Sequence, residues 1–275
     1  MSVVLLALAS AALFGAMTIA IRLALRPGDD AGLVTLATVL PAFVVSLVAA
    51  AVPHDAHGAW PFLLAGLLAP GASQILFTLA VREAGASRTS VTVGAAPLVA
   101  VAIALVLLHE PLRLPLVAGA LCVVAGGVLL AAERDRPEHV RALGLLYAVG
   151  ATVLFATRDN VARALHGRSH PETAAAATLL AGVAVGLLWT RRAPAVDQLR
   201  RFAPAGIFFG LSYVCLFEAY FRGRVTVVSP LVATESLWGV GLSALLIRHT
   251  EGVGRKLALG ALLVVAGGAV IGAFR

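Results

Sequence analysis

The sequence predicts an all-α integral membrane protein in which ten transmembrane helices form two inverted-topology repeats of five. Three observations support this fold class: low charge content, long apolar stretches and an internal duplication. The chain is 60% hydrophobic and 13% charged over 275 residues, whereas soluble domains carry about 25% charged residues. A helix needs about 20 apolar residues to cross the hydrocarbon core. The apolar stretches span residues 3–25, 32–52, 60–81, 89–108, 114–132, 142–165, 172–190, 203–221, 226–247 and 256–274.

The duplication is clearest near the end of each half. Residues 116–127 (LVAGALCVVAGG) and 257–268 (LALGALLVVAGG) are identical at nine of twelve positions, at an offset of 141 residues. The same offset pairs Leu13-Phe14 with Leu154-Phe155, Arg22 with Arg163, and Glu110 with Glu251. Because each copy has an odd number of crossings, the second copy enters the membrane from the opposite side. Inverted repeats typically build a binding site at their interface near the bilayer midplane.

The division into domains follows from the longest charged break, residues 133–141 (ERDRPEHVR). It separates a first repeat, residues 1–132, from a second repeat, residues 142–275, and the other loops are too short to hold a soluble domain. The first apolar run has no basic start and no convincing cleavage site, so we expect it to remain as a membrane span.

The net charge of +7 does not indicate a nucleic-acid partner. The 20 arginines and one lysine lie mostly in short loops and at span ends, and no basic stripe with interleaved aromatic residues is present. Counted by loop, six lie on the side of the C-terminus and fourteen on the other, a bias that places both termini outside the cytoplasm. Cys122 and Cys215 both fall inside apolar spans, and no Cys/His cluster predicts a disulfide, a metal site or a cofactor.

One spacing pattern occurs in the second half of each repeat. Pro97 is followed after thirteen residues by Glu110, then by Gly119-Ala120-Leu121 and Ala125-Gly126-Gly127, and in the second copy Trp238 stands thirteen residues before Glu251. With the Leu13-Phe14-Gly15 step in the first span, this pattern resembles the EamA domain of the drug/metabolite transporter superfamily. The resemblance covers nearly the whole chain as two domains.

The resemblance implies a ten-helix carrier of the cell membrane that exports or exchanges a small organic solute through a central cavity. It also implies cytoplasmic termini, against the charge bias, and both orientations stay open. In this family the last span of each repeat mediates packing, including between subunits. Small residues let helices approach closely in lipid, and Gly119 with Gly126, like Gly260 with Gly267, share one helical face. A homodimer through the fifth and tenth spans and packing within one chain are both compatible with these seams.

Candidate site residues are the polar groups inside the spans, because such groups are costly in the membrane and need a partner or a water-filled cavity. The sixth span carries the densest cluster, in which Asp159 and Arg163, four residues apart, are expected to pair. Glu235 lies near the middle of the ninth span, with Trp238 three residues on and available for stacking on a cation. The candidate substrate-binding residues are Arg158, Asp159, Asn160, Glu218, Glu235, Trp238, Gln74 and Tyr213. A structural ion pair at positions 159 and 163, and a protonated Glu235 bonded to a neighbouring helix, are the alternatives.

An enzyme is the rival class, but the sequence contains no HExxH, GxSxG, P-loop or Gly-rich dinucleotide motif. The mixed charge of Arg158, Asp159, Glu218 and Glu235 favours transport of a zwitterion such as an amino acid. Efflux of hydrophobic cations, favoured by Glu235 with Trp238, and flipping of a lipid-linked substrate, favoured by Arg158 and Arg163, are the alternatives. The predicted partners are therefore a small-molecule substrate and membrane lipids.

Overall fold

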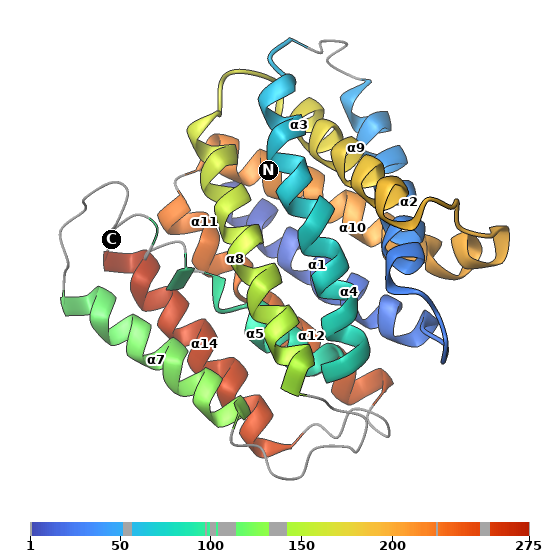
Figure 1. Cartoon of the computed structure of the whole chain (residues 1–275). Coiled ribbons are helices and arrows are strands. Elements are labelled where there is room, and N and C mark those ends of the chain that lie inside the picture. The colour runs from blue at the N-terminus through green and yellow to red at the C-terminus, as the bar shows by residue number, and fades with distance from the viewer. Residues whose placement is uncertain are drawn as a thin grey trace.

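A computed structural model describes residues 2–51, 57–96, 98–99, 103, 114–131, 142–223, 225–247 and 254–274 (Figure 1). Over these residues the protein is all-α, as predicted, and contains no strand. The helices are α1 (Val3–Ala24), α2 (Ala31–Ala50), α3 (Trp60–Gly66), η1 (Leu67–Ala72), α4 (Ser73–Ala84), α5 (Ala86–Val93), α7 (Leu114–Ala131), α8 (Ala142–Ala164), α9 (Pro171–Thr190), α10 (Val196–Arg222), α11 (Val225–Val232), α12 (Glu235–Leu246) and α14 (Arg255–Phe274).

Six helical segments of the described chain are long and apolar enough to cross a membrane. They are Val3–Ala24, Ala31–Ala50, Trp60–Ala84, Ala142–Ala164, Pro171–Thr190 and Val196–Arg222. Each corresponds to one predicted span, and the protein is therefore a multi-span membrane protein. The eighth span begins seven residues earlier than predicted, because α10 continues through the polar turn at Val196–Arg201.

Helix boundaries follow local capping chemistry. Asp30 caps α2, its Oδ1 accepting from the Leu33 amide at 2.9 Å, which satisfies a backbone donor that the first turn leaves unpaired. Pro171 opens α9, where its missing N–H has no cost. Gly85, with φ +85°, makes the sharp turn between α4 and α5, a conformation that favours glycine.

The third span contains a break that the sequence did not predict. Leu67–Ala72 is a π-helical segment in which Ala69 leaves helical geometry (φ −143°, ψ 116°) ahead of Pro70. The break packs on α9, where a Cβ at Gly182 would approach Pro70 Cγ to 2.6 Å. The glycine therefore makes room for the bend.

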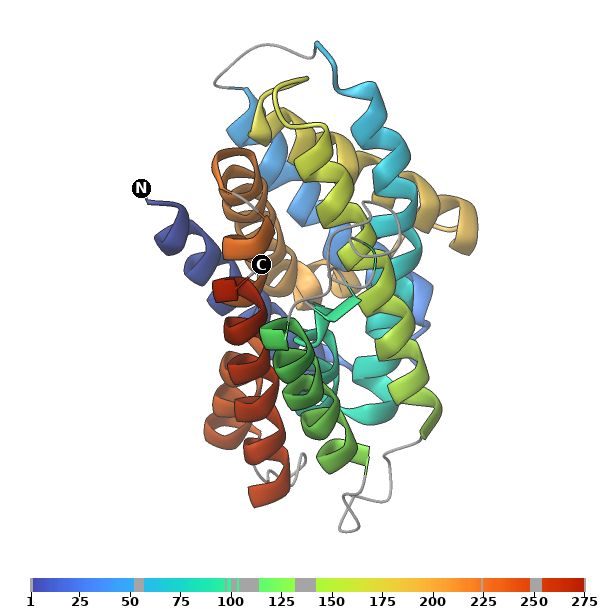
Figure 2. The same ribbon diagram turned by 90° about the vertical axis from the view of Figure 1, so that its left-hand side faces the viewer.

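The helices α7 and α14 lie side by side at one edge of the molecule (Figures 1 and 2). A Cβ at Gly126 would lie 2.7 Å from the Gly260 carbonyl, and a Cβ at Gly267 would lie 2.5 Å from the Gly119 carbonyl. This pairing order shows that the two helices run in opposite directions. The glycine-bearing faces of α7 and α14 thus pack on each other within one chain. A homodimer through these helices stays a prediction.

Aromatic residues fill the centre of the bundle, where α1 packs on α10 and α8 packs on α4. Phe14 and Phe155, equivalent at the offset of 141, contact each other edge to face with ring centroids 5.8 Å apart. Phe77 lies 5.3 Å from Phe14 and 6.2 Å from Phe155. Phe209 joins the cluster at 6.1 Å from Phe14 and continues to Tyr213 at 4.6 Å. The cluster contacts residues of both repeats and leads directly to the charged groups of α8.

An ionic cluster ties the α1–α2 loop to the beginning of α10. Arg201 donates to both oxygens of Asp29 at 3.1 Å, to Asp197 at 3.0 Å and to the Ala24 carbonyl at 2.9 Å. Although burial acts in the opposite sense, the hydrogen bonds from Arg201 and from the Arg26 amide hold the pKa of Asp29 below its ordinary value. Both side chains are largely buried.

Candidate functional site

Arg158 and Asp159 form a buried ion pair on α8, directly beside the central aromatic cluster. The Nε and Nη2 groups of Arg158 donate to Asp159 Oδ1 at 2.8 and 2.6 Å. Nη1 donates to the Tyr213 hydroxyl on α10. The guanidinium also lies over the rings of Tyr213 and Phe155, 4.8 and 5.4 Å from their centroids. A buried charge needs such partners, because desolvation is otherwise very costly.

The Arg158 guanidinium keeps unused donor capacity. Arginine carries five N–H donors, and three of them are engaged by Asp159 and Tyr213. One N–H on Nη1 and one on Nη2 have no acceptor among the described residues. Two N–H groups on the terminal nitrogens are the fork that binds a carboxylate in a bidentate manner.

The expected pairing of Asp159 with Arg163 is wrong. Asp159 Oδ2 instead accepts from the Tyr220 hydroxyl at 3.0 Å. Arg163 Nη1 donates to the backbone carbonyls of Tyr220 and Phe221 at 3.1 and 3.3 Å. Those carbonyls belong to the last turn of α10, where helices leave acceptors unpaired and favour a nearby cation.

Glu235 is the second charged group of the site. It begins α12, directly after the two-residue break between α11 and α12, and is 5% exposed. Its carboxylate lies within electrostatic range of Asp159 and Arg158. Within the described chain it receives no hydrogen bond. The site therefore holds a carboxylate with open acceptor positions in the electrostatic neighbourhood of an arginine with open donors.

Trp238 does not join this group, although it is three residues from Glu235. Its side chain is half exposed and lines a separate pocket of about 400 Å³. A Cβ at Gly15 would lie 2.7 Å from Trp238 Cβ, so α1 packs closely on the backbone of α12 at this point. The pocket is lined by Leu8, Thr234, Leu237, Trp238, Gly241, Leu242 and Leu245.

Three other predicted residues lie apart from the Arg158–Asp159 pair. Asn160 donates to the Ala156 carbonyl of its own helix at 2.8 Å. Glu218 forms an ion pair with Arg222 at 2.5 Å, one turn later on α10. Gln74 is fully buried on α4 with its Nε2 4.0 Å from Met17 Sδ. Its Oε1 has no hydrogen-bond partner in the described structure.

The family-pattern residues Pro97, Glu110 and Glu251 lie outside the described residues. The potential metal ligands that the structure does describe form no group of three or more His, Cys, Asp or Glu side chains.

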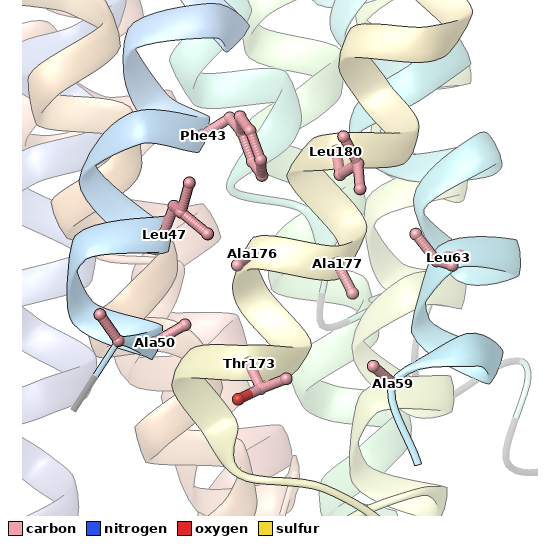
Figure 3. A pocket seen from close by; sticks show the side chains of 10 residues that line it. Phe43, Leu47, Ala50, Ala59, Leu63, Thr173, Ala176, Ala177 and Leu180 are labelled. Atoms are coloured by element: carbon pink, nitrogen blue, oxygen red, sulfur yellow. The ribbon is translucent and has the colours of Figure 1, made fainter. Parts of the chain in front are cut away.

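A second pocket, of about 410 Å³, lies between α2, α3 and α9 (Figure 3). Phe43, Leu47 and Leu180 extend into it, and Thr173 is the one polar lining residue. This pocket contains no charged group and is not lined by any residue of the Arg158 cluster. Its lining offers a polar solute one hydroxyl group and no charge, so the candidate site remains the group around Arg158, Asp159, Tyr213, Tyr220 and Glu235.

Tyr220 is the residue that the predicted site lacked. It lies seven residues, or two helical turns, after Tyr213, and this spacing places both hydroxyl groups on one face of α10. Both side chains are fully buried. A buried tyrosine hydroxyl usually finds a partner, so the spacing was a usable signal.

Comparison with known proteins decides the family. The profile of the EamA-like transporter family matches residues 1–132 and 142–273, nearly the entire chain in two repeats. The chain belongs to the EamA-like transporter family. A crystal structure of another protein, 23% identical, matches with a TM-score of 0.70 over 98% of this chain and 96% of that chain. This likeness concerns the fold alone. No curated protein matches the sequence.

Membership in the EamA-like transporter family agrees with the resemblance drawn from the spacing of Pro97, Glu110 and residues 119–127 and from its counterpart in the second repeat. The protein is a drug/metabolite transporter-like membrane protein with two EamA repeats. The Arg158–Asp159 pair and its two tyrosine partners lie in the second repeat, on α8 and α10.

Proposed function

We propose that this protein is a secondary transporter of the cell membrane that carries a zwitterionic organic solute, such as an amino acid, by alternating access. Export or exchange is the direction of transport that membership in the EamA-like transporter family suggests. The solute carboxylate binds the two open N–H groups of Arg158, and its ammonium group binds Glu235. Tyr213 holds the guanidinium in place.

One observation carries this proposal: the site has open hydrogen-bonding capacity of both signs. Arg158 and Asp159 neutralise each other, yet Arg158 retains two N–H donors. Glu235 is buried without a hydrogen-bond donor among the described residues. A ligand with one negative and one positive group offers a partner to each: its carboxylate accepts from Arg158, and its ammonium group donates to Glu235.

The proposed architecture is ten transmembrane helices in two five-helix repeats of inverted topology, with residues 133–141 as the linker. The opposite directions of α7 and α14 support it, because these are the last spans of the two repeats. The contact of the equivalent residues Phe14 and Phe155 supports a repeat interface at the centre of the bundle, where such transporters bind their substrates.

The test is thermal unfolding of the purified protein against the twenty standard amino acids. A ligand that binds only the folded state, at about 100 times its dissociation constant, adds about 2.7 kcal/mol of stability. For each amino acid that shifts unfolding, the methyl ester and the N-acetyl derivative remove one charge each and are expected to bind at least about tenfold more weakly. Equal binding of the ester would remove the role of Arg158.

Efflux of hydrophobic cations is the second candidate, favoured by the apolar pocket that Trp238 lines together with Thr234, the residue directly before Glu235 in the sequence. A quaternary amine requires Glu235 but not the Arg158 fork. If quaternary amines shift unfolding and amino acids do not, this candidate replaces the first. Glu235→Gln is expected to abolish binding for both candidates, so this variant tests the role of the carboxylate. The ligand panel tests whether the substrate is an amino acid or a quaternary amine.

A further inference from the structure

We propose that Tyr220 is a positioning residue that reserves the open N–H groups of Arg158 for a solute carboxylate. This inference rests on the proposed function, because it concerns how the same site prefers a zwitterion to a simple amine.

Tyr220 is held at both ends by α8. Its hydroxyl donates to Asp159 Oδ2 at 3.0 Å. Its backbone carbonyl accepts from Arg163 Nη1 at 3.1 Å. The side chain is 1% exposed, so water does not replace the phenol as a donor to Asp159. These contacts fix the hydroxyl against one oxygen of the carboxylate.

Asp159 uses its two oxygens for different partners. Oδ1 alone accepts from Nε and Nη2 of Arg158, whereas Oδ2 accepts from Tyr220. A carboxylate beside an arginine otherwise tends to engage it with both oxygens. By occupying Oδ2, Tyr220 keeps Asp159 to one edge of the guanidinium and leaves the remaining N–H groups open.

Removal of the Tyr220 hydroxyl changes this competition. Oδ2 would be a buried acceptor without a partner, which costs about 1–3 kcal/mol. The strongest donors at hand are the open N–H groups of Arg158, so Asp159 rotates to take them. The solute carboxylate then loses its partners, whereas an ammonium group on Glu235 does not.

The experiment compares Tyr220→Phe with the wild-type protein and with Tyr147→Phe. Tyr147 is a half-buried tyrosine of α8, eleven residues before Arg158, and serves as the matched control. The probes are the standard amino acid that shifts wild-type unfolding most and its decarboxylated amine, each titrated by calorimetry in lipid nanodiscs.

We expect Tyr220→Phe to raise the dissociation constant of the amino acid about tenfold and to change that of the amine by less than about twofold. Tyr147→Phe is expected to change neither. Equal losses for both probes would mean a merely structural role and would overturn the inference while leaving the transport proposal intact. If no amino acid binds the wild-type protein, the proposed function itself fails, and the inference fails with it.

Discussion

Equivalent positions of the two repeats carry opposite chemistry. At an offset of 141 residues, Arg158 and Asp159 of α8 correspond to Met17 and Thr18 of α1. The Thr18 hydroxyl donates to the Phe14 carbonyl of its own helix at 2.9 Å, and Met17 is a buried apolar residue. Arg158 and Asp159 instead form an ion pair that reaches two tyrosines of α10.

The surrounding framework is nevertheless shared. Phe14 and Phe155 occupy equivalent positions one turn before these pairs and contact each other. At these positions, therefore, the two repeats share the packing phenylalanine but differ in charge, because only the second repeat carries the Arg-Asp pair. We therefore assign Phe14 and Phe155 to packing, and Arg158 and Asp159 to the candidate site.

The largest effect on stability is expected from substitution of Arg158. Arg158→Met leaves Asp159 buried with Tyr220 as its remaining partner, and we expect a loss of about 3–5 kcal/mol in the free energy of unfolding. Adding Asp159→Thr recreates the Met-Thr pair of the first repeat and is expected to recover most of this loss. Chemical denaturation of both variants in detergent measures the difference. A double variant no more stable than the single one would contradict a charge-pair explanation.

The shared framework is tested at the seam between α7 and α14. Gly267→Val places side-chain atoms against the Gly119 carbonyl, which lies 2.5 Å from the Cβ position. Such overpacking costs about 1–3 kcal/mol. Gly241→Ala is the control, because nothing lies within 4 Å of its Cβ position. Thermal unfolding should show a loss for the first variant and none for the second.

Much of the framework could be predicted from sequence because apolar length and small-residue spacing are local signals. Six predicted spans correspond to membrane-length helices, and the seam glycines pack as their spacing implies. The break at Leu67–Ala72 was missed, since Pro70 alone does not indicate where a long apolar run leaves helical geometry.

The site was less predictable because it depends on how helices far apart in sequence rotate toward each other. The spacing of four residues favoured an ion pair between Asp159 and Arg163. In the structure, Arg163 instead donates to the backbone carbonyls at the end of α10. Spacing of three placed Trp238 beside Glu235, but contact with Gly15 aligns α12 so that the indole lines another pocket. Polar character within the apolar spans made Arg158, Asp159, Tyr213 and Glu235 candidates, whereas the hydrogen-bond partners of Arg158 and Asp159 could be seen only in the fold.

The two repeats also differ in an ion pair that should make stability depend on pH. Asp29 and Arg201 form an ion pair, whereas their counterparts at the offset are His170 and Trp60. Because the folded-state pKa of Asp29 is lowered from 3.8, its stabilisation is present above that value and is lost as pH falls through the folded pKa. Asp29→Asn should cost about 1 kcal/mol at neutral pH.

We expect the stability difference between the wild-type protein and Asp29→Asn to vanish between about pH 5 and about pH 2. Unfolding curves at several pH values measure it. A difference that stays constant across this range would show that the carboxylate charge contributes nothing.

The smallest effect is expected at Gln74, the polar group of the first repeat that lies next to Met17. Its buried Oε1 has no partner in the described structure, so Gln74→Met removes an unsatisfied acceptor at similar volume. The expected change is neutral or a gain of up to about 1 kcal/mol. A clear loss in thermal unfolding would indicate that the amide oxygen does have a partner.

The most direct test of the central claim is amino-acid binding to the double variant Arg158→Met with Asp159→Thr, in which the second repeat carries the pair found in the first. Calorimetry would use an amino acid that binds the wild-type protein, with unfolding measured on the same sample. We predict a folded protein that no longer binds the amino acid. A folded double variant that binds it with wild-type affinity would contradict the assignment of the solute carboxylate to Arg158.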